Sequence, residues 1–138
     1  MNVIIDTNVV LDVLANRIPF AKASAEAIAL AEQNGCLLAI TANAVTDLYF
    51  LLLRHLSDVV RAKTLLKGAV ERIVVLDTTR EICLSAFKSP ISDFEDAVLV
   101  ESALRWGADC IVTRNTRDFA ASPVEAITPD ELLHRFAN

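Results

Sequence analysis

The sequence predicts one α/β domain over residues 1–138, with a mostly parallel central sheet and helices on both faces, in three layers. Short apolar runs alternate with longer segments of helical spacing along the whole chain. Such alternation favours parallel strands joined by crossover helices. Only three glycines and four prolines are present, so most loops are expected to be short. A chain of 138 residues has the length of one ordinary domain.

The first half of the chain opens with a β-branched run that stops at Asp6, which is typical of a buried strand. An Ala-rich segment ends at Asn34-Gly35, a helix stop signal. Thr41 can cap a helix that carries Leu48 and Leu52 on one face. The expected elements are a strand over 2–5, helices over 9–16 and 19–33, a strand over 36–40, a helix after Thr41 and a helix from Ser57 to about Val70.

The second half continues the alternation up to a closing helix. Thr78 or Thr79 is expected to cap one helix, and Ser92 or Asp93 the next. The expected elements are a strand over 72–76, a helix ending near Phe87, a break at 88–91, a helix ending at Trp106-Gly107, a strand over 109–113, a polar loop over 114–123, a strand over 125–127 and a helix that begins at Thr128-Pro129.

Composition excludes several classes of protein. Apolar residues make up 54% of the chain, too many for a disordered protein, and the longest apolar run is too short to cross a bilayer. No signal peptide is visible at the N-terminus. Three widely spaced cysteines are expected to be free thiols in the reducing cytoplasm. The net charge of −5 argues against binding nucleic acid through bulk basic charge.

The common catalytic and nucleotide-binding motifs are absent. No glycine-rich turn follows the first strand, and no P-loop or nucleophile elbow is present. His55 and His134 each lack a second zinc ligand at the usual spacing. The distribution of acids is therefore the informative feature.

Acidic residues follow the expected strands. Asp6 ends the first strand, and Asp118 lies in the loop after the strand over 109–113. Asp93, Glu95 and Asp96 fall in the first turn of the helix that precedes that strand. Ligands of open parallel sheets bind at the carboxyl ends of the strands, so these acids are expected to lie near one another.

Each acid also has an ordinary structural explanation. Asp6 could end a strand or cap a helix, Asp93 and Asp96 suit a helix N-terminus, and Asp118 suits a polar loop. Asp47 could face solvent from within its helix. Together, however, Asp6, Asp47, Asp96 and Asp118 would repel one another at one sheet edge, and Mg²⁺ or Mn²⁺ would relieve that repulsion. Such a site can cleave phosphodiesters.

Three blocks of the sequence resemble the PIN-domain family. They are Val-Ile-Ile-Asp-Thr-Asn around Asp6, Ser-Asp-Phe-Glu-Asp-Ala around Asp96, and Ile-Val-Thr-Arg-Asn-Thr-Arg-Asp-Phe ending at Phe119. Their order and spacing match the family along nearly the whole chain. The resemblance implies an α/β/α fold with one or two Mg²⁺ or Mn²⁺ ions in an acidic pocket. It also implies metal-dependent cleavage of single-stranded RNA.

The resemblance assigns roles to individual residues. Asp6, Asp96 and Asp118 match the family's metal-binding acids, and Asp47 falls where the family commonly has glutamate. Asp93 would take an auxiliary metal role. The small polar residues that match the pocket lining are Thr7, Asn8, Thr113 and Asn115. Arg114 and Arg117 could hold a flanking phosphate of the RNA, or could simply be solvated.

Two departures from the family pattern stand out. Asp47 is one methylene shorter than glutamate, which could shift a ligand distance or insert a water. Asn115 stands where many relatives have an acid, so a second metal site depends on Asp118. Metal stoichiometry therefore stays open.

Many small PIN proteins similar to this chain are VapC-type toxins of toxin–antitoxin pairs. The resemblance thus implies a cytoplasmic endoribonuclease toxin, an antitoxin partner and a homodimer, with no membrane association. The apolar residues are compatible with such interfaces and equally with an ordinary core.

Two other functions are open to the sequence. A degenerate PIN module could bind RNA or a protein partner without catalysis, and the residues at positions 47 and 115 favour it. A phosphatase of the haloacid-dehalogenase kind, with Asp6 as nucleophile, is disfavoured because Asn8 stands where its second aspartate belongs. A flap-endonuclease activity is disfavoured because the chain lacks the helical arch.

We expect Asp6→Asn and Asp96→Asn each to abolish binding of a divalent metal, because each removes a charged oxygen ligand. Calorimetric titration with Mn²⁺ measures this loss. Unchanged Mn²⁺ affinity in both variants would contradict the metal hypothesis.

Overall fold

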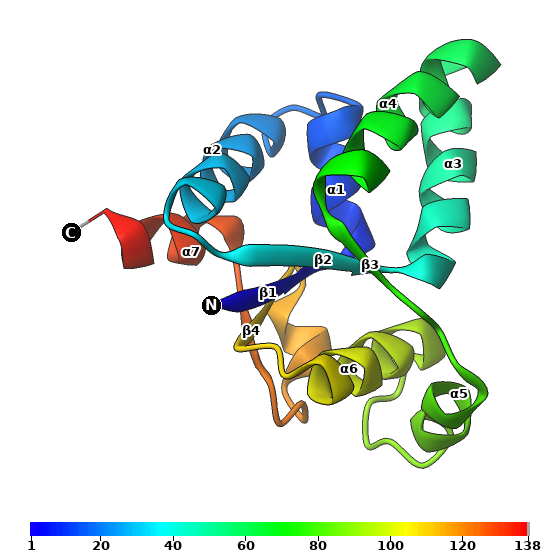
Figure 1. Ribbon diagram of the computed structural model, residues 1–138, viewed down its shortest axis with the longest axis vertical. Helices are drawn as coiled ribbons and strands as arrows, with labels where there is room; N and C mark the ends of the chain where they lie inside the picture. Colours follow the sequence, from blue (N-terminus) through cyan, green and yellow to red (C-terminus); the bar gives the residue numbers. More distant parts are fainter. Residues whose placement is uncertain (138) are drawn as a thin grey trace.

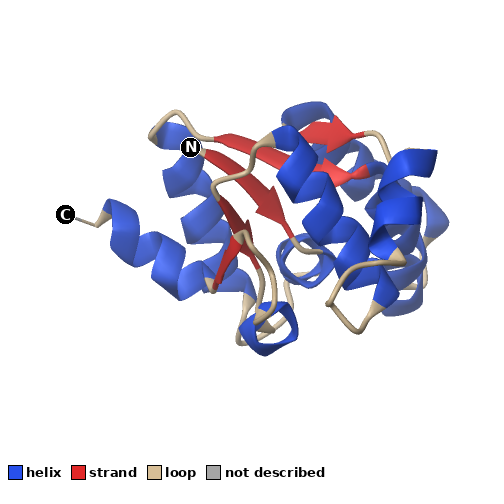
Figure 2. Ribbon diagram, turned by 90° about the horizontal axis from the view of Figure 1, so that it is seen from below, coloured by secondary structure: helices blue, strands red, loops and turns tan. Residues whose placement is uncertain are grey.

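The computed structural model describes residues 1–137, which form a sheet between two layers of helices (Figures 1 and 2). The strands are β1 (Asn2–Ile5), β2 (Leu37–Thr41), β3 (Val74–Leu76), β4 (Cys110–Val112) and β5 (Glu125–Ile127). All neighbouring strands pair in parallel, in the order β3-β2-β1-β4-β5. The prediction of a three-layer α/β/α fold with a parallel sheet is confirmed.

Seven helices and one 3₁₀ turn connect and cover these strands in the described residues. They are α1 (Thr7–Leu14), α2 (Ala21–Gln33), α3 (Ala42–Leu56), α4 (Val59–Arg72), α5 (Arg80–Ala86), α6 (Phe94–Trp106), η1 (Thr116–Phe119) and α7 (Pro129–Phe136). Figure 1 shows α1 to α4 and α7 on one face of the sheet and α5 and α6 on the other.

The alternation of side chains along β1 explains the two layers. Val3 and Ile5 pack into a core with α1, α2, α3, α4 and α7, whereas Ile4 packs into the opposite core with α5 and α6. All three side chains are buried. Because strand side chains point to alternate faces, a run of consecutive apolar residues must be covered on both sides.

The expected caps are largely present. Thr79 accepts a hydrogen bond from the Ile82 N–H, and Asp93 accepts one from the Asp96 N–H. Thr128 forms a capping box with Glu131, with Pro129 in the first turn of α7. Thr41 precedes α3, but its side chain makes no capping hydrogen bond.

Several expected boundaries differ from the structure by one or two residues, as at both ends of α1 and at the start of α2, and two of the differences have a clear local cause. Ser57 does not begin a helix: it adopts a left-handed conformation (φ 54°) that ends α3, and Asp58 caps α4 instead. The strand expected over 72–76 begins only at Val74, because α4 continues through Arg72. The polar loop over 114–123 contains the turn η1.

The cysteines are free thiols, with Cys36 and Cys110 buried and Cys83 partly buried. Within the described residues, no helix is both long and apolar enough to span a membrane.

The carboxyl ends of β1 and β4 lie side by side. The Asp6 N–H donates to the Val112 carbonyl oxygen at 2.9 Å, so backbone pairing continues past the end of β1. Asp6 is thus held by the backbone at the sheet edge where α1, α3 and η1 begin.

We expect Leu48→Ala to lower the free energy of unfolding by about 2–5 kcal/mol, because its side chain is fully buried between α3 and the sheet. Leu104→Ala, at a position in α6 that is 44% exposed, is the matched control and should cost about 0.5 kcal/mol or less. Urea unfolding measures both. Equal losses would contradict this assignment of the core.

Candidate active site

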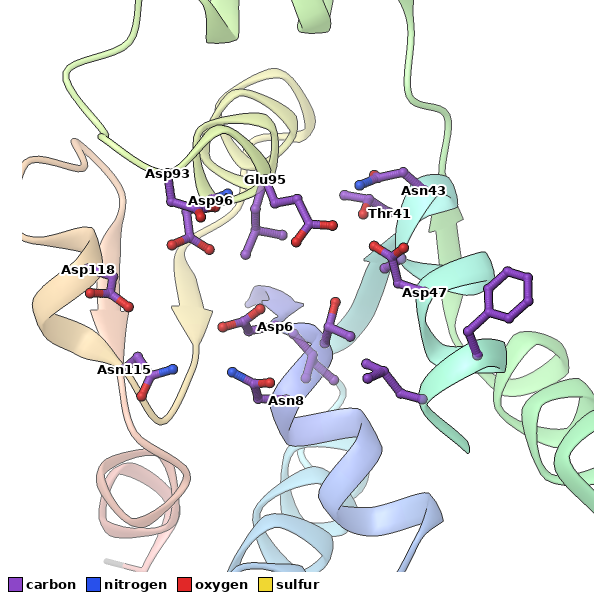
Figure 3. A pocket seen from close by; sticks show the side chains of 16 residues that line it. Asp6, Asn8, Thr41, Asn43, Asp47, Asp93, Glu95, Asp96, Asn115 and Asp118 are labelled. Atoms are coloured by element: carbon purple, nitrogen blue, oxygen red, sulfur yellow. Dashed lines mark hydrogen bonds between the residues drawn. The ribbon is translucent and has the colours of Figure 1, made fainter. Parts of the chain in front are cut away.

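A cavity of about 460 Å³ opens at the carboxyl edge of the sheet (Figure 3). Six carboxylates line it: Asp6, Asp47, Asp93, Glu95, Asp96 and Asp118. The polar residues Thr7, Asn8, Thr41, Asn43 and Asn115 line it as well. Within residues 1–137, no lysine, arginine or histidine lines this cavity.

Four parts of the chain bring the carboxylates together. Asp6 follows β1, Asp47 lies in the second turn of α3, and Asp118 lies in η1. Asp93 caps α6, and Glu95 and Asp96 occupy its first turn. The predicted convergence of Asp6, Asp47, Asp96 and Asp118 on one cavity is thus what the structure has.

Thr113 fixes the orientation of Asp6. Its side chain is fully buried, and its hydroxyl donates to Asp6 Oδ2 at 2.8 Å. The Thr113 hydroxyl oxygen in turn accepts the Asn115 N–H at 3.0 Å, so Thr113 links the loop after β4 to Asp6. Thr113 therefore does not line the cavity itself but orients Asp6, which does.

The carboxylates repel one another and are partly desolvated. Burial, followed by the charges of Asp93, Asp6 and Asp118, raises the pKa of Asp96 to about 6. Burial also raises the pKa of Asp6, although the Thr113 hydrogen bond and the Arg114 charge oppose that rise. Asp6, Asp96 and Asp118 thus form one group of interacting charges.

Glu95 and Asp47 form a second group, and Figure 3 shows their side chains facing each other across the cavity. A hydrogen bond from protonated Glu95 to Asp47, together with burial and the neighbouring charges, raises the pKa of Glu95 to about 7. Asp93 contributes repulsion to both groups.

This set of oxygen donors fits a hard divalent cation. Six carboxylates and three amide side chains surround one cavity, and repulsion among the carboxylates contributes to the raised pKa values of Glu95 and Asp96. No three acidic, histidine or cysteine side chains within residues 1–137 lie close enough to form a preformed metal cluster.

The two arginines expected to contact RNA lie outside the cavity. Arg114 Nε donates to Asp12 Oδ2 at 2.6 Å, so its guanidinium is already bound to a carboxylate. Arg117 is exposed in η1 and does not line the cavity. Asp12 is fully buried, and sequence analysis did not single it out.

Several residues of the lining were not expected from the sequence, among them Glu95, Asn43 and Phe50. Glu95 was noted in the acidic first turn of α6 but was not assigned to the site. Its position between Asp93 and Asp96 was the available signal, because all side chains of a short first turn lie near the same edge. Nothing in the sequence pattern distinguished Asn43 or Phe50 from other residues of α3.

A model of the PIN domain matches residues 2–117 of the sequence. The chain belongs to the PIN-domain family. Among curated protein sequences, none matches it significantly.

Solved structures share the fold of this PIN domain. VapBC2 from Rickettsia felis, bound to a DNA fragment from its promoter, aligns with a TM-score of 0.74 at 14% identity, covering 93% of this chain and 98% of the other. A toxin–antitoxin complex from Klebsiella pneumoniae aligns with a TM-score of 0.69 at 19% identity, covering 92% of this chain and 97% of the other. VapBC-1 from nontypeable Haemophilus influenzae aligns with a TM-score of 0.66 at 19% identity, covering 94% of this chain and 98% of the other.

The raised pKa of Glu95 predicts how pH affects the stability of the PIN domain without metal. The unfolded chain releases the Glu95 proton near pH 4.5 and the native state only near pH 7, so native stability falls as pH rises between these values and the loss is complete above about pH 7. Glu95→Gln stays neutral and avoids this loss. We therefore expect the melting temperature of Glu95→Gln, relative to the unmodified protein, to rise between pH 5 and pH 8 in EDTA.

Glu101→Gln is the matched control, since it removes a carboxylate of α6 that lies outside the cavity. Thermal denaturation followed by circular dichroism measures both variants. A Glu95→Gln difference that stays constant between pH 5 and pH 8 would count against the repulsion described here.

Proposed function

We propose that this PIN domain is a Mg²⁺- or Mn²⁺-dependent endoribonuclease that hydrolyses phosphodiester bonds of single-stranded RNA. The observation that carries the proposal is the convergence of Asp6, Asp96 and Asp118 on one cavity, with a pKa for Asp96 raised to about 6 by burial and by the other carboxylates. A divalent cation bound among these carboxylates would offset their repulsion.

Asp6, Asp96 and Asp118 would hold the cation, with Asp47, Glu95 and Asp93 available for a second ion or for water. These six carboxylates could bind one or two ions. A bound Mg²⁺ or Mn²⁺ would supply Lewis-acid chemistry, which favours ionisation of water and stabilises charge on the phosphoryl oxygens.

The protein's own groups have separate tasks. The Thr113 hydroxyl holds one Asp6 oxygen through a hydrogen bond and so leaves the other to face the cavity. Asn8 and Asn115 present amide groups that can donate to phosphate or ribose oxygens. In the hydrolysis, a water oxygen forms a bond to phosphorus as the in-line bond from phosphorus to the ribose oxygen breaks; the water loses a proton, the departing ribose oxygen gains one, and no covalent enzyme intermediate forms.

We also propose that the protein is the toxin of a toxin–antitoxin pair, with an antitoxin partner, and that it forms a homodimer in the cytoplasm. The shared fold with chains of toxin–antitoxin complexes supports the partner. An apolar cavity of about 310 Å³ between α1, α2 and α4, lined by Val10, Val13, Ile28 and Leu65, offers a surface for protein contact. The free cysteines suit a reducing compartment.

We expect the protein to cleave a mixed-sequence pool of single-stranded RNA in the presence of Mg²⁺ or Mn²⁺. EDTA, Asp6→Asn or Asp96→Asn should each abolish cleavage, because each removes the cation or a ligand for it. Gel electrophoresis of end-labelled RNA measures the products. Asp77→Asn is the matched control and should cleave normally, since Asp77 is exposed beyond β3 and outside the acidic cavity.

Cleavage that persists in EDTA would overturn the metal-dependent mechanism. RNA binding without cleavage, unaffected by EDTA, would instead indicate the alternative function: a PIN module that binds RNA or a protein partner without catalysis.

A further inference from the structure

A second cavity, of about 400 Å³, lies at the same edge of the sheet between the N-termini of α2 and α7. Its lining residues come from three parts of the chain: Pro19, Phe20, Ala23 and Ser24 at the start of α2, Arg114 after β4, and Thr128, Pro129 and Asp130 at the start of α7. None of them lines the acidic cavity. The volume falls in the range of small-molecule sites.

Two planar groups stack in the wall of this cavity. The Arg114 guanidinium carbon lies 4.0 Å from the centroid of the Phe20 ring. Phe20 is 37% exposed and the Arg114 side chain 23% exposed, so both remain accessible. Single-stranded nucleic acids are commonly bound by stacking their bases on aromatic rings and guanidinium planes.

A buried carboxylate holds this stack in place. Asp12 accepts from Arg114 Nε at 2.6 Å and from a terminal guanidinium nitrogen at 3.4 Å. Arg17 Nε lies 3.3 Å from the same carboxylate. Two cations therefore share one fully buried anion, which anchors the Arg114 guanidinium beside the Phe20 ring. Preorganised planar groups bind at a lower entropic cost than mobile ones.

Two polar groups of the lining favour a nucleotide over a simple anion. The Ser24 hydroxyl is the one buried side-chain polar atom within residues 1–137 that lacks a hydrogen-bond partner, and a ligand or water could supply one. Asp130 would repel inorganic phosphate, but its carboxylate can accept from the amino group of a base.

The two cavities adjoin across a short segment of backbone. Thr113 hydrogen-bonds to Asp6, Arg114 lines the second cavity, and Asn115 lines the acidic one. A strand of RNA that crosses this segment can place one phosphodiester among the carboxylates and a neighbouring nucleotide in the second cavity.

We propose that the second cavity is a subsite for one unpaired nucleotide of the RNA, whose base stacks on Phe20 and Arg114 and whose phosphate lies near Arg114. The inference rests on the proposed RNA substrate and extends it, because it assigns recognition to a stacked base beside the cleavage site. A base with an exocyclic amine is favoured over uracil by Asp130.

The test is binding of fluorescently labelled octa-adenylate RNA, followed by fluorescence anisotropy in EDTA, with a series of octamers that each carry one abasic position. For the unmodified protein we expect one abasic position to weaken binding about tenfold more than the others. Phe20→Ala should weaken binding of intact RNA to a similar extent and become insensitive to that position. Phe20→Tyr, which keeps the ring, should bind normally.

Phe87→Ala is the matched control, because Phe87 is an exposed phenylalanine (74%) outside both cavities and should leave binding unchanged. Three results would each overturn the subsite: no binding by the folded protein, an unchanged affinity in Phe20→Ala, or an abasic penalty that persists in that variant. If Phe20→Ala binds RNA normally but changes the molar mass of the protein in solution, Phe20 would belong to a contact between copies of the chain. The binding assay is run in EDTA and is independent of cleavage. A failure of RNA cleavage would therefore contradict the nuclease proposal, whereas a failure of this binding test would contradict the subsite alone.

Discussion

Repulsion among carboxylates at one sheet edge is the constraint on which the rest of this structure depends. Parallel strands end at the same edge, so the residues that follow β1 and β4 are brought together whatever their charge. The apolar layers on both faces of the sheet provide the free energy that holds them there. Asp6 is additionally held by its backbone hydrogen bond to Val112 and by the Thr113 hydroxyl.

The cationic groups of this region are arranged to leave the acidic cavity without a positive side chain. Asp12 binds the Arg114 guanidinium, and Arg114, which does not line the cavity, acts on Asp6 only through its charge. A guanidinium that entered the cavity would neutralise the carboxylates and compete with a metal ion. Helix α1 positions both aspartates: Asp6, which lines the acidic cavity, directly precedes its first residue, and Asp12, which binds Arg114, lies in its last turn.

Much of the fold was predictable because it follows from local pattern. The β-branched runs identified the strands. Asp6 directly follows the first strand, and Asp96 lies in the first turn of the helix that leads to β4, so both positions indicate the carboxyl edge of the sheet. Ser57 was assigned wrongly because its left-handed conformation, rather than its residue type, ends α3. The partnership of Arg114 with Asp12 could not be predicted, since the residues are 102 positions apart and Asp12 lies within an apolar helix. The hydrogen bond between Glu95 and Asp47 likewise depends on how α3 and α6 approach each other.

Among residues 1–137, no basic side chain lines the acidic cavity, and this has a consequence for the rate at which the protein encounters a polyanion. A protein of net charge −5 approaches RNA against a repulsive field, unlike a basic protein that is steered towards it. Salt screens that field over about 10 Å at 0.1 M ionic strength. The association rate constant should therefore increase with ionic strength, the reverse of the usual behaviour of RNA-binding proteins, and divalent ions should accelerate the encounter more than monovalent ions at equal concentration.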